Sequence, residues 1–336
     1  MTNKLTTVVS ALLIILLCVC GSLPTAARHS SSTLQQASSD FKQGEKYFEA
    51  GDFDRAIDYF LQATYSARNN YYPDAYFYLG LSYKAKHQDQ KAIEALGKAI
   101  QQAIGPAPEA HLELGKIYMR DNQDKLAEQE FNAAMAGSFN EWGPEAQNYL
   151  GLLAEKHGDV VTAQSCFLAA LGERPWKNTK AWMNYGEFLM RQQNWGDALI
   201  TFQEMIDRGS SLKNLNKPRI YLNMGICLYA KGDHQGALEQ WRRVCTLEPE
   251  LAKPHLLLGD MFEKESHISS AITEYHDYLR LAPEGDKNIS AVKDRLSVLE
   301  QKKSAASQGS PVHDLHKPRS LTTQRDSLAP EPDAGF

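Results

Sequence analysis

Seven glycines recur along the chain at nearly constant intervals, and this spacing constrains the fold more than any other feature. The steps between them are 36, 35, 36, 35, 39 and 34 residues. A period of this length indicates stacked structural units, each in contact with its neighbours, rather than one large core. The glycines are Gly44, Gly80, Gly115, Gly151, Gly186, Gly225 and Gly259.

Two further positions keep register with these glycines. Twelve residues after each glycine stands an alanine: Ala56, Ala92, Ala127, Ala163, Ala198, Ala237 and Ala271. Sixteen residues after each glycine stands a large apolar residue: Phe60, Leu96, Phe131, Phe167, Phe202, Trp241 and Tyr275. The surrounding apolar residues have helical spacing and are divided by a polar turn, so each unit predicts two antiparallel helices. We expect the glycine and the alanine to face each other where the helices cross, because larger side chains would force the helices apart.

A helical pair of about 34 residues with this pattern resembles the tetratricopeptide repeat. The resemblance covers residues 37–284 and implies an all-α, superhelical solenoid of about seven helix-turn-helix repeats. Three features depart from the family pattern. Asp40, His111 and His255 replace the aromatic residue usual early in the first helix of a unit. Ala154 replaces the aromatic residue usual three positions after the glycine, and the 39-residue step lengthens the link before the sixth unit.

Residues 285–303 are expected to form a helix that caps the last repeat. Ile289, Val292, Leu296 and Leu299 follow one another at spacings of 3, 4 and 3 residues, which is one apolar stripe on a helix. Residues 304–336 hold four prolines among Ser, Gln and Asp and show no helical or strand period. This segment is predicted to be a disordered tail.

Residues 1–27 have the pattern of a secretory signal peptide, with an apolar run too short to span a bilayer comfortably. Two ends of the signal fit the sequence. In the first, small residues before Arg28 suit a signal peptidase, which would cleave after residue 27. In the second, the segment ending in Cys20 resembles a bacterial lipobox, so the signal would end at residue 19 and Cys20 would be lipidated. Val19 departs from that motif. Both alternatives predict an exported chain, either free in the periplasm or attached to a membrane through its N-terminus and facing the periplasm. Residues 28–36 are predicted to be a flexible tether.

The sequence offers no signature of catalysis or nucleic-acid binding. Lys and Arg number 36 against 41 Asp and Glu, so no strongly basic face is expected. Gly-x-Ser-x-Gly, a phosphate loop and His-Glu-x-x-His are all absent from the sequence. We therefore predict a protein that is not an enzyme and needs no cofactor, metal or small-molecule substrate.

Histidines and cysteines support the same interpretation. His87, His157, His234 and His267 fall in or beside turns of four different units, too far apart on a solenoid to share a metal. His111 and His255 are expected to pack between units. Cys166, Cys227 and Cys245 occupy core-like helical positions, which favours buried free thiols; a bridge between Cys227 and Cys245 is the alternative.

The family resemblance assigns a concave, partner-binding wall to four positions on the first helix of each repeat: three before, one after, four after and five after the glycine. The apolar residues there are Phe41, Phe48, Phe77, Leu81, Leu112, Met119, Leu152, Met183, Met190, Leu222, Ile226 and Tyr229. Charged residues form the margin of this wall: Glu45, Lys84, Lys116, Arg120, Glu155, Lys156, Glu187, Arg191, Asp260 and Lys264. Such a groove suits a helix or extended segment of a protein partner.

A signal with a candidate lipobox, followed by an all-repeat body, also resembles the type IV pilus biogenesis lipoproteins, or pilotins. Asn184-Tyr185-Gly186 and Asn223-Met224-Gly225 match stretches of that family loosely. The resemblance implies a scaffold in the cell envelope that helps assemble a type IV pilus or its secretin. The alternative is an envelope adaptor that recruits a hydrolase or peptidoglycan machinery.

Overall fold

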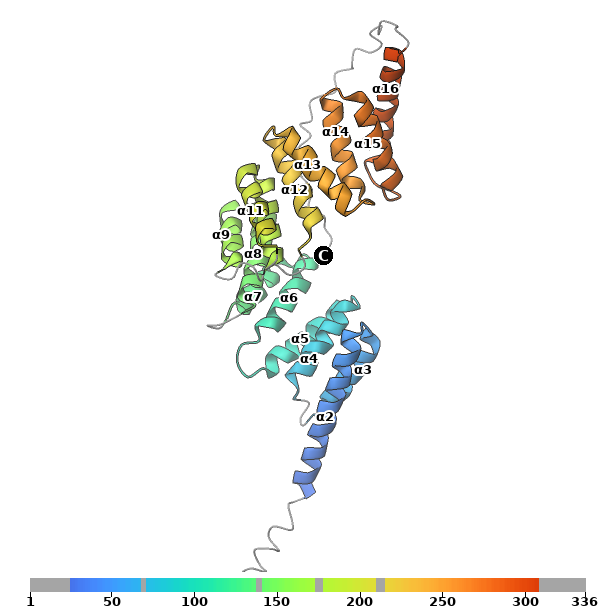
Figure 1. Cartoon of the computed structure of the whole chain (residues 1–336). Coiled ribbons are helices and arrows are strands. Elements are labelled where there is room, and N and C mark those ends of the chain that lie inside the picture. The colour runs from blue at the N-terminus through green and yellow to red at the C-terminus, as the bar shows by residue number, and fades with distance from the viewer. Residues whose placement is uncertain (1–24, 68–70, 137–140, 173–177, 210–214, 308–336) are drawn as a thin grey trace, which may run out of the picture. The chain divides into compact units, whose positions relative to one another are not determined.

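The computed structural model describes residues 25–67, 71–136, 141–172, 178–209 and 215–307, with side chains between residues 34 and 306 (Figure 1). Every regular element among them is an α-helix, and there are fifteen, labelled α2 to α16. The predicted all-α class is confirmed. The predicted signal up to residue 24, including Cys20, and the predicted tail from residue 308 lie outside the described residues. None of the described helices is both long enough and apolar enough to cross a membrane.

The helices follow the predicted repeats two by two. The pairs are α2 (Thr25–Glu49) and α3 (Phe53–Ser66), α4 (Pro73–Ala85) and α5 (Asp89–Gln102), α6 (Pro108–Arg120) and α7 (Asp124–Ala134), α8 (Gly143–Lys156) and α9 (Val160–Leu171), α10 (Thr179–Arg191) and α11 (Trp195–Asp207), α12 (Lys217–Ala230) and α13 (His234–Leu247), and α14 (Ala252–Lys264) and α15 (Ile268–Leu281). The last helix is α16 (Ile289–Ser307).

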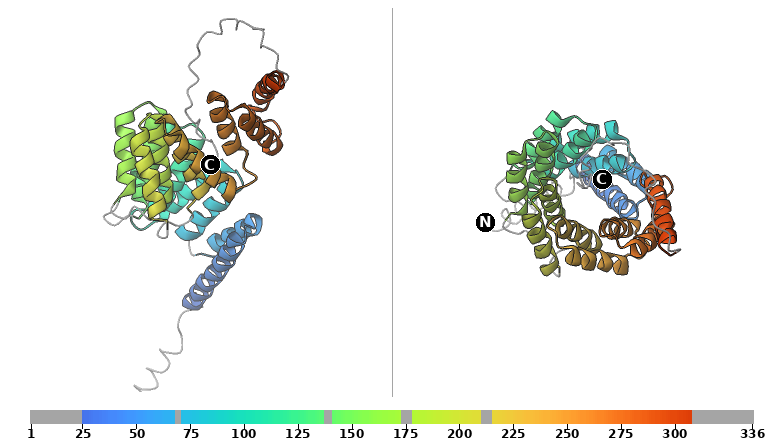
Figure 2. Two further views of the ribbon diagram at one scale, coloured as in Figure 1. Left: turned by 45° about the horizontal axis from the view of Figure 1, so that its top comes forward. Right: turned by 90° about the horizontal axis from the view of Figure 1, so that it is seen from above.

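The chain divides into two compact units, and the division falls inside α8, between Leu153 and Ala154. In the first unit α2 packs on α3, α4 on α5 and α6 on α7. In the second, α10 packs on α11, α12 on α13 and α14 on α15. Figure 2 shows the consecutive helices of each unit lying against one another.

The recurrent glycines make room for the large apolar residue of the second helix. A Cβ on Gly44 would lie 2.5 Å from the Phe60 ring, and a Cβ on Gly115 would lie 2.5 Å from the Phe131 ring. No real Cβ tolerates such a distance, so only glycine fits beneath the ring. The prediction that the glycine faces the alanine is therefore wrong in detail: the atoms nearest the glycine belong to the residue one turn beyond the alanine.

The turn between the two helices also repeats, at a position that the sequence patterns did not reveal. Seven residues after each of the seven glycines, the backbone is left-handed: Gly51 (φ 75°), His87 (φ 56°), Asn122 (φ 57°), Gly158 (φ 78°), Gln193 (φ 58°), Gly232 (φ 82°) and Ser266 (φ 62°). This conformation ends the first helix and reverses the chain. Asp or Asn then caps the second helix in several repeats; Asp52, for example, accepts the Arg55 backbone N–H.

The last helix, α16, packs against α15 at the end of the repeats. Val292, Leu296 and Leu299 of α16 are buried in one cluster with residues of α13, α14 and α15. The helix continues through residue 307, four residues into the segment predicted to be a tail.

The predicted tether at residues 28–36 is wrong, because α2 begins at Thr25 and includes this segment. Neither glycine nor proline interrupts residues 25–43, so nothing in the local sequence ends the helix. Pro24 directly precedes the first helical residue, a place where proline is tolerated.

Candidate protein-binding surface

Of the twelve apolar residues predicted to form the binding wall, three are buried and nine are partly exposed in the structure. Leu112 (0% exposed), Met183 (8%) and Met190 (0%) are buried. Leu112 packs in one cluster with Phe131 and Tyr149, so it belongs to the core. The prediction that these three residues line the binding wall is therefore wrong. Nine remain partly exposed, and we call them the apolar wall: Phe41, Phe48, Phe77, Leu81, Met119 and Leu152 in the first unit, and Leu222, Ile226 and Tyr229 in the second.

The first two repeats extend the apolar wall with aromatic rings that the sequence reasoning missed. The ring of Phe41 lies 5.2 Å from that of Tyr72 and 5.6 Å from that of Tyr78. The ring of Phe48 lies 5.5 Å from that of Tyr78 and 5.6 Å from that of Phe53. The first two repeats are rich in aromatic residues, and this could have indicated the additional rings. Tyr72, Tyr78 and Phe53 do not occupy any of the four wall positions, so the family pattern did not include them.

Several charged residues predicted at the margin of the wall form ion pairs with side chains of other first helices. In the first unit, the Glu113 carboxylate lies 2.5 Å from Lys84 Nζ and 2.7 Å from Lys116 Nζ, which also lies 2.9 Å from Glu145. Burial acts to raise the pKa of Glu113, but the two ammonium groups outweigh it and hold that pKa below its ordinary value. These contacts join α4, α6 and α8, so they connect the first helices of successive repeats.

The second unit repeats this arrangement with arginine. Arg191 donates two hydrogen bonds to the Glu155 carboxylate, at 2.6 and 2.7 Å. Arg219 donates two to Glu187, at 2.8 and 3.0 Å, and the Asn223 amide donates a third at 3.2 Å. Bidentate pairs of this kind fix the relative position of two helices as well as their charges. Contacts between repeats therefore use five residues of the predicted margin, which sequence spacing could not show: Lys84, Lys116, Glu155, Glu187 and Arg191.

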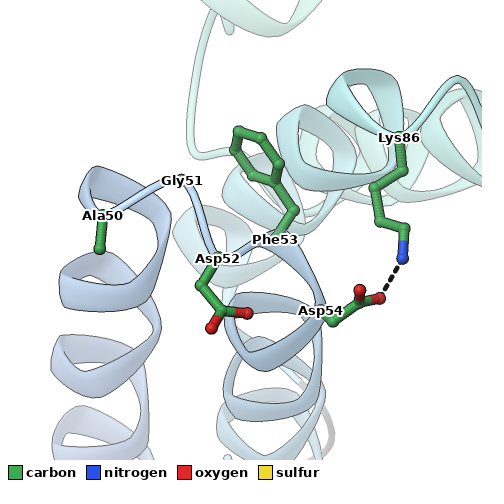
Figure 3. Close-up of a pocket in the computed structure, with 6 residues that line it drawn as sticks. All are labelled: Ala50, Gly51, Asp52, Phe53, Asp54 and Lys86. Carbon is green, nitrogen blue, oxygen red and sulfur yellow. Dashed lines mark hydrogen bonds and ion pairs between the residues drawn. The ribbon is translucent and has the colours of Figure 1, made fainter.

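A shallow, open hollow lies at the turn of the first repeat (Figure 3). Its lining comes from residues 50–54 and Lys86, and Lys86 forms an ion pair with Asp54. Figure 3 shows the Phe53 ring directed away from this ion pair. The ring instead meets Phe48, so the hollow borders the aromatic part of the wall.

The histidines are held mainly by carboxylates. His111 lies 2.7 Å from Glu130, and His255 lies 2.8 Å from Glu274. His234 and His267 lie 2.6 and 3.5 Å from the same residue, Glu265, so the expectation that all turn histidines are far apart is wrong for this pair.

His255 and Glu274 also form, with Asp277, a group whose donor atoms all lie within 4.8 Å of one another. Asp277 accepts a hydrogen bond from Arg280 at 3.1 Å. Each of the three side chains thus has a protein partner already.

Cys166, Cys227 and Cys245 are free thiols in the structure, so the bridge between Cys227 and Cys245 is not formed. Burial raises the pKa of the Cys227 thiol to about 12, and burial, together with the Glu274 carboxylate, raises that of Cys245 to about 11. Both groups are protonated at neutral pH and act as small apolar side chains.

Comparison with known proteins agrees with this geometry. The tetratricopeptide repeat family model matches residues 41–103, 85–141 and 149–213. The type IV pilus assembly protein PilF of Pseudomonas aeruginosa is 21% identical over 252 residues, which cover 75% of this chain and 83% of PilF.

Two solved structures have a similar fold. A tetratricopeptide repeat protein from Parabacteroides merdae matches with a TM-score of 0.55 and 15% identity, over 79% of this chain and 99% of its own. The type IV pilus biogenesis factor PilW matches with a TM-score of 0.55 and 18% identity, over 63% of this chain and 94% of its own. Helix pairs, glycine register, family match and structural likeness agree: the chain is a tetratricopeptide repeat protein.

Proposed function

We propose that this protein is an exported, non-enzymatic scaffold that holds another protein of the cell envelope against the apolar wall and so assists assembly of a type IV pilus or its secretin. The observation that carries the proposal is the apolar wall itself, which presents partly exposed side chains from four successive first helices of the first unit and from α12 in the second. Tetratricopeptide repeats are protein-interaction scaffolds, and the similarity to PilF and PilW suggests the process.

The electrostatics beside the wall favour an apolar contact. Because Lys84, Lys116 and Glu113 satisfy one another, a partner does not have to supply charges to them. Met119 adds a flexible side chain that adapts to the shape of a partner. The affinity of such a contact depends on a few well-packed residues rather than on its total area.

The wall is tested by capture of the partner from the native cell envelope with tagged protein, followed by mass spectrometry. Leu81→Glu and Met119→Glu should each abolish capture, because a carboxylate would lose its hydration against an apolar partner surface. Circular dichroism should show unchanged helix content. Leu126→Glu is the matched control, since Leu126 is 40% exposed on α7, outside the wall.

Equal capture by Leu81→Glu, Met119→Glu and Leu126→Glu would show that the partner binds elsewhere. A purified protein that turns over a substrate efficiently would contradict the non-enzymatic role.

Export is tested separately through the N-terminus of the mature protein. If Cys20 is lipidated, labelled palmitate is incorporated and Cys20→Ser abolishes both the label and membrane association. If the signal is instead removed after residue 27, sequencing of the mature protein begins at Arg28. A mature protein that retains residues 1–27 without a lipid would overturn the proposed export.

A further inference from the structure

Three carboxylates in the first two repeats lack the ion pairs that hold other first-helix charges. Glu45 and Glu49 lie on α2, and Asp74 lies in the first turn of α4. Within the described residues, none of the three has an ion pair or a side-chain hydrogen bond. Lys42 and Lys46 share α2 with two of them and form no ion pair with either.

Partly exposed aromatic rings lie beside these carboxylates. Phe48 and Tyr78 meet edge to face with ring centres 5.5 Å apart, and Phe41 connects Tyr78 with Tyr72 at 5.6 and 5.2 Å. Burial raises the pKa of both tyrosines, and the charges of Asp74 and Glu45 raise it further. The carboxylates therefore lie close enough to the two phenols to affect them. We call Phe48, Tyr72, Tyr78, Glu45, Glu49 and Asp74 the acidic aromatic patch.

Aromatic rings with carboxylates beside them hold a cation elsewhere in the protein, and two examples show the arrangement. Lys116 lies 5.4 Å from the centre of the Tyr149 ring while it pairs with two glutamates. Arg295 lies 4.9 Å from the centre of the Tyr275 ring while it pairs with Asp260 and Glu263. A ring face together with carboxylates attracts a positive group by cation–π and ionic interactions.

In the acidic aromatic patch that cation is not supplied by the described residues, none of which places a positive group over Tyr72, Tyr78 or Phe48. We propose that the patch binds an arginine-containing basic segment of the partner protein, which places a guanidinium against the Glu45 carboxylate beside the Phe48 and Tyr78 rings. Arginine fits better than lysine because its planar head stacks on a ring and pairs with a carboxylate at once. The proposal rests on the proposed function and specifies the chemistry of the partner.

The test is fluorescence anisotropy of the full chain with a labelled short peptide in which arginines alternate with serines. The triple variant Glu45→Gln, Glu49→Gln, Asp74→Asn should weaken binding by about tenfold, since exposed ion pairs contribute modestly and here act together. The matched control is Asp58→Asn, Glu94→Gln, Glu128→Gln. It removes three exposed carboxylates from the second helices of the first three repeats and so makes the same change in net charge. The control should change binding by less than about twofold.

Two outcomes would overturn the proposal. Equal losses in the two triple variants would show that the peptide responds only to overall charge. Failure of the wild-type chain to bind the arginine peptide better than a peptide with glutamates in place of the arginines would show that the patch holds no cation. Thermal melting of both variants confirms that each is folded.

A second readout separates this proposal from the proposed function. If the envelope partner is still captured while the arginine peptide does not bind, the patch proposal fails and the scaffold role stands. If wild-type protein captures no envelope partner, the scaffold role fails, whatever the peptide does.

Discussion

The contact that recurs along the repeats joins a glycine of the first helix to a large apolar side chain of the second helix. Gly115 allows the Phe131 ring to lie directly on the backbone of α6, and Phe131 is completely buried there. The ring also stacks on Tyr149 at 5.1 Å, so one residue connects its own repeat with the next. A side chain added at Gly115 therefore disturbs two contacts, since the ring has nowhere to move.

Substitution of two glycines should have opposite effects on stability. Gly115→Ala is expected to destabilise the protein by about 1–3 kcal/mol, because the new methyl group overlaps the Phe131 ring. Gly97→Ala is the control: Gly97 is exposed within α5, and nothing lies within 4 Å of its added Cβ. There we expect a gain of about 0.5–1 kcal/mol from helix propensity. Thermal melting followed by circular dichroism measures both, and a stabilised Gly115→Ala would refute the packing described.

At the scale of the element, the last helix completes the core of the second unit. A stack of repeats leaves an apolar face on its final pair, which needs a cover. α16 supplies it with Val292, Leu296 and Leu299, while Arg295 between them pairs with Asp260 and Glu263 of α14. Burial of Tyr275 and its hydrogen bond to Glu263 raise the pKa of its phenol, which stays protonated. The phenol oxygen lies 2.7 Å from Glu263 and 2.9 Å from Asp260, so its one O–H is shared between the two carboxylates.

Two substitutions on α16 distinguish its covering face from its exposed face. Leu296→Ala should cost about 2–4 kcal/mol, because Leu296 is buried and its loss leaves a cavity. Val298→Ala should cost less than about 0.5 kcal/mol, because Val298 is 49% exposed on the same helix. The comparison is made by denaturant unfolding. Equal effects of the two substitutions would mean that α16 does not cover the last repeat.

At the scale of the whole molecule, the repeats share a backbone pattern but differ in their surfaces. The first two repeats combine aromatic rings with unpaired carboxylates, whereas the fifth and sixth join their first helices through Arg219 and Glu187. A repeat scaffold permits this variety, because each unit depends on its neighbours for packing and not on the identity of its exposed residues. The acidic aromatic patch shares Phe48 with the apolar wall, and substitutions at different residues test the two surfaces.

The sequence by itself determined the repeat, the fold class and the capping stripe, because these depend on short-range periodicity along a helix. It also identified Gly115 and Phe131 as fixed positions, although it paired the glycine with the wrong neighbour. Only the tertiary structure decided that Leu112 is buried, since the residues that cover it come from other helices. The tertiary structure also decided that Glu187 forms an ion pair with Arg219, 32 residues away. It likewise decided which carboxylates of the first two repeats have no ion pair. Burial and charge pairing depend on which side chain a neighbouring repeat presents, and the period of one repeat does not contain that information.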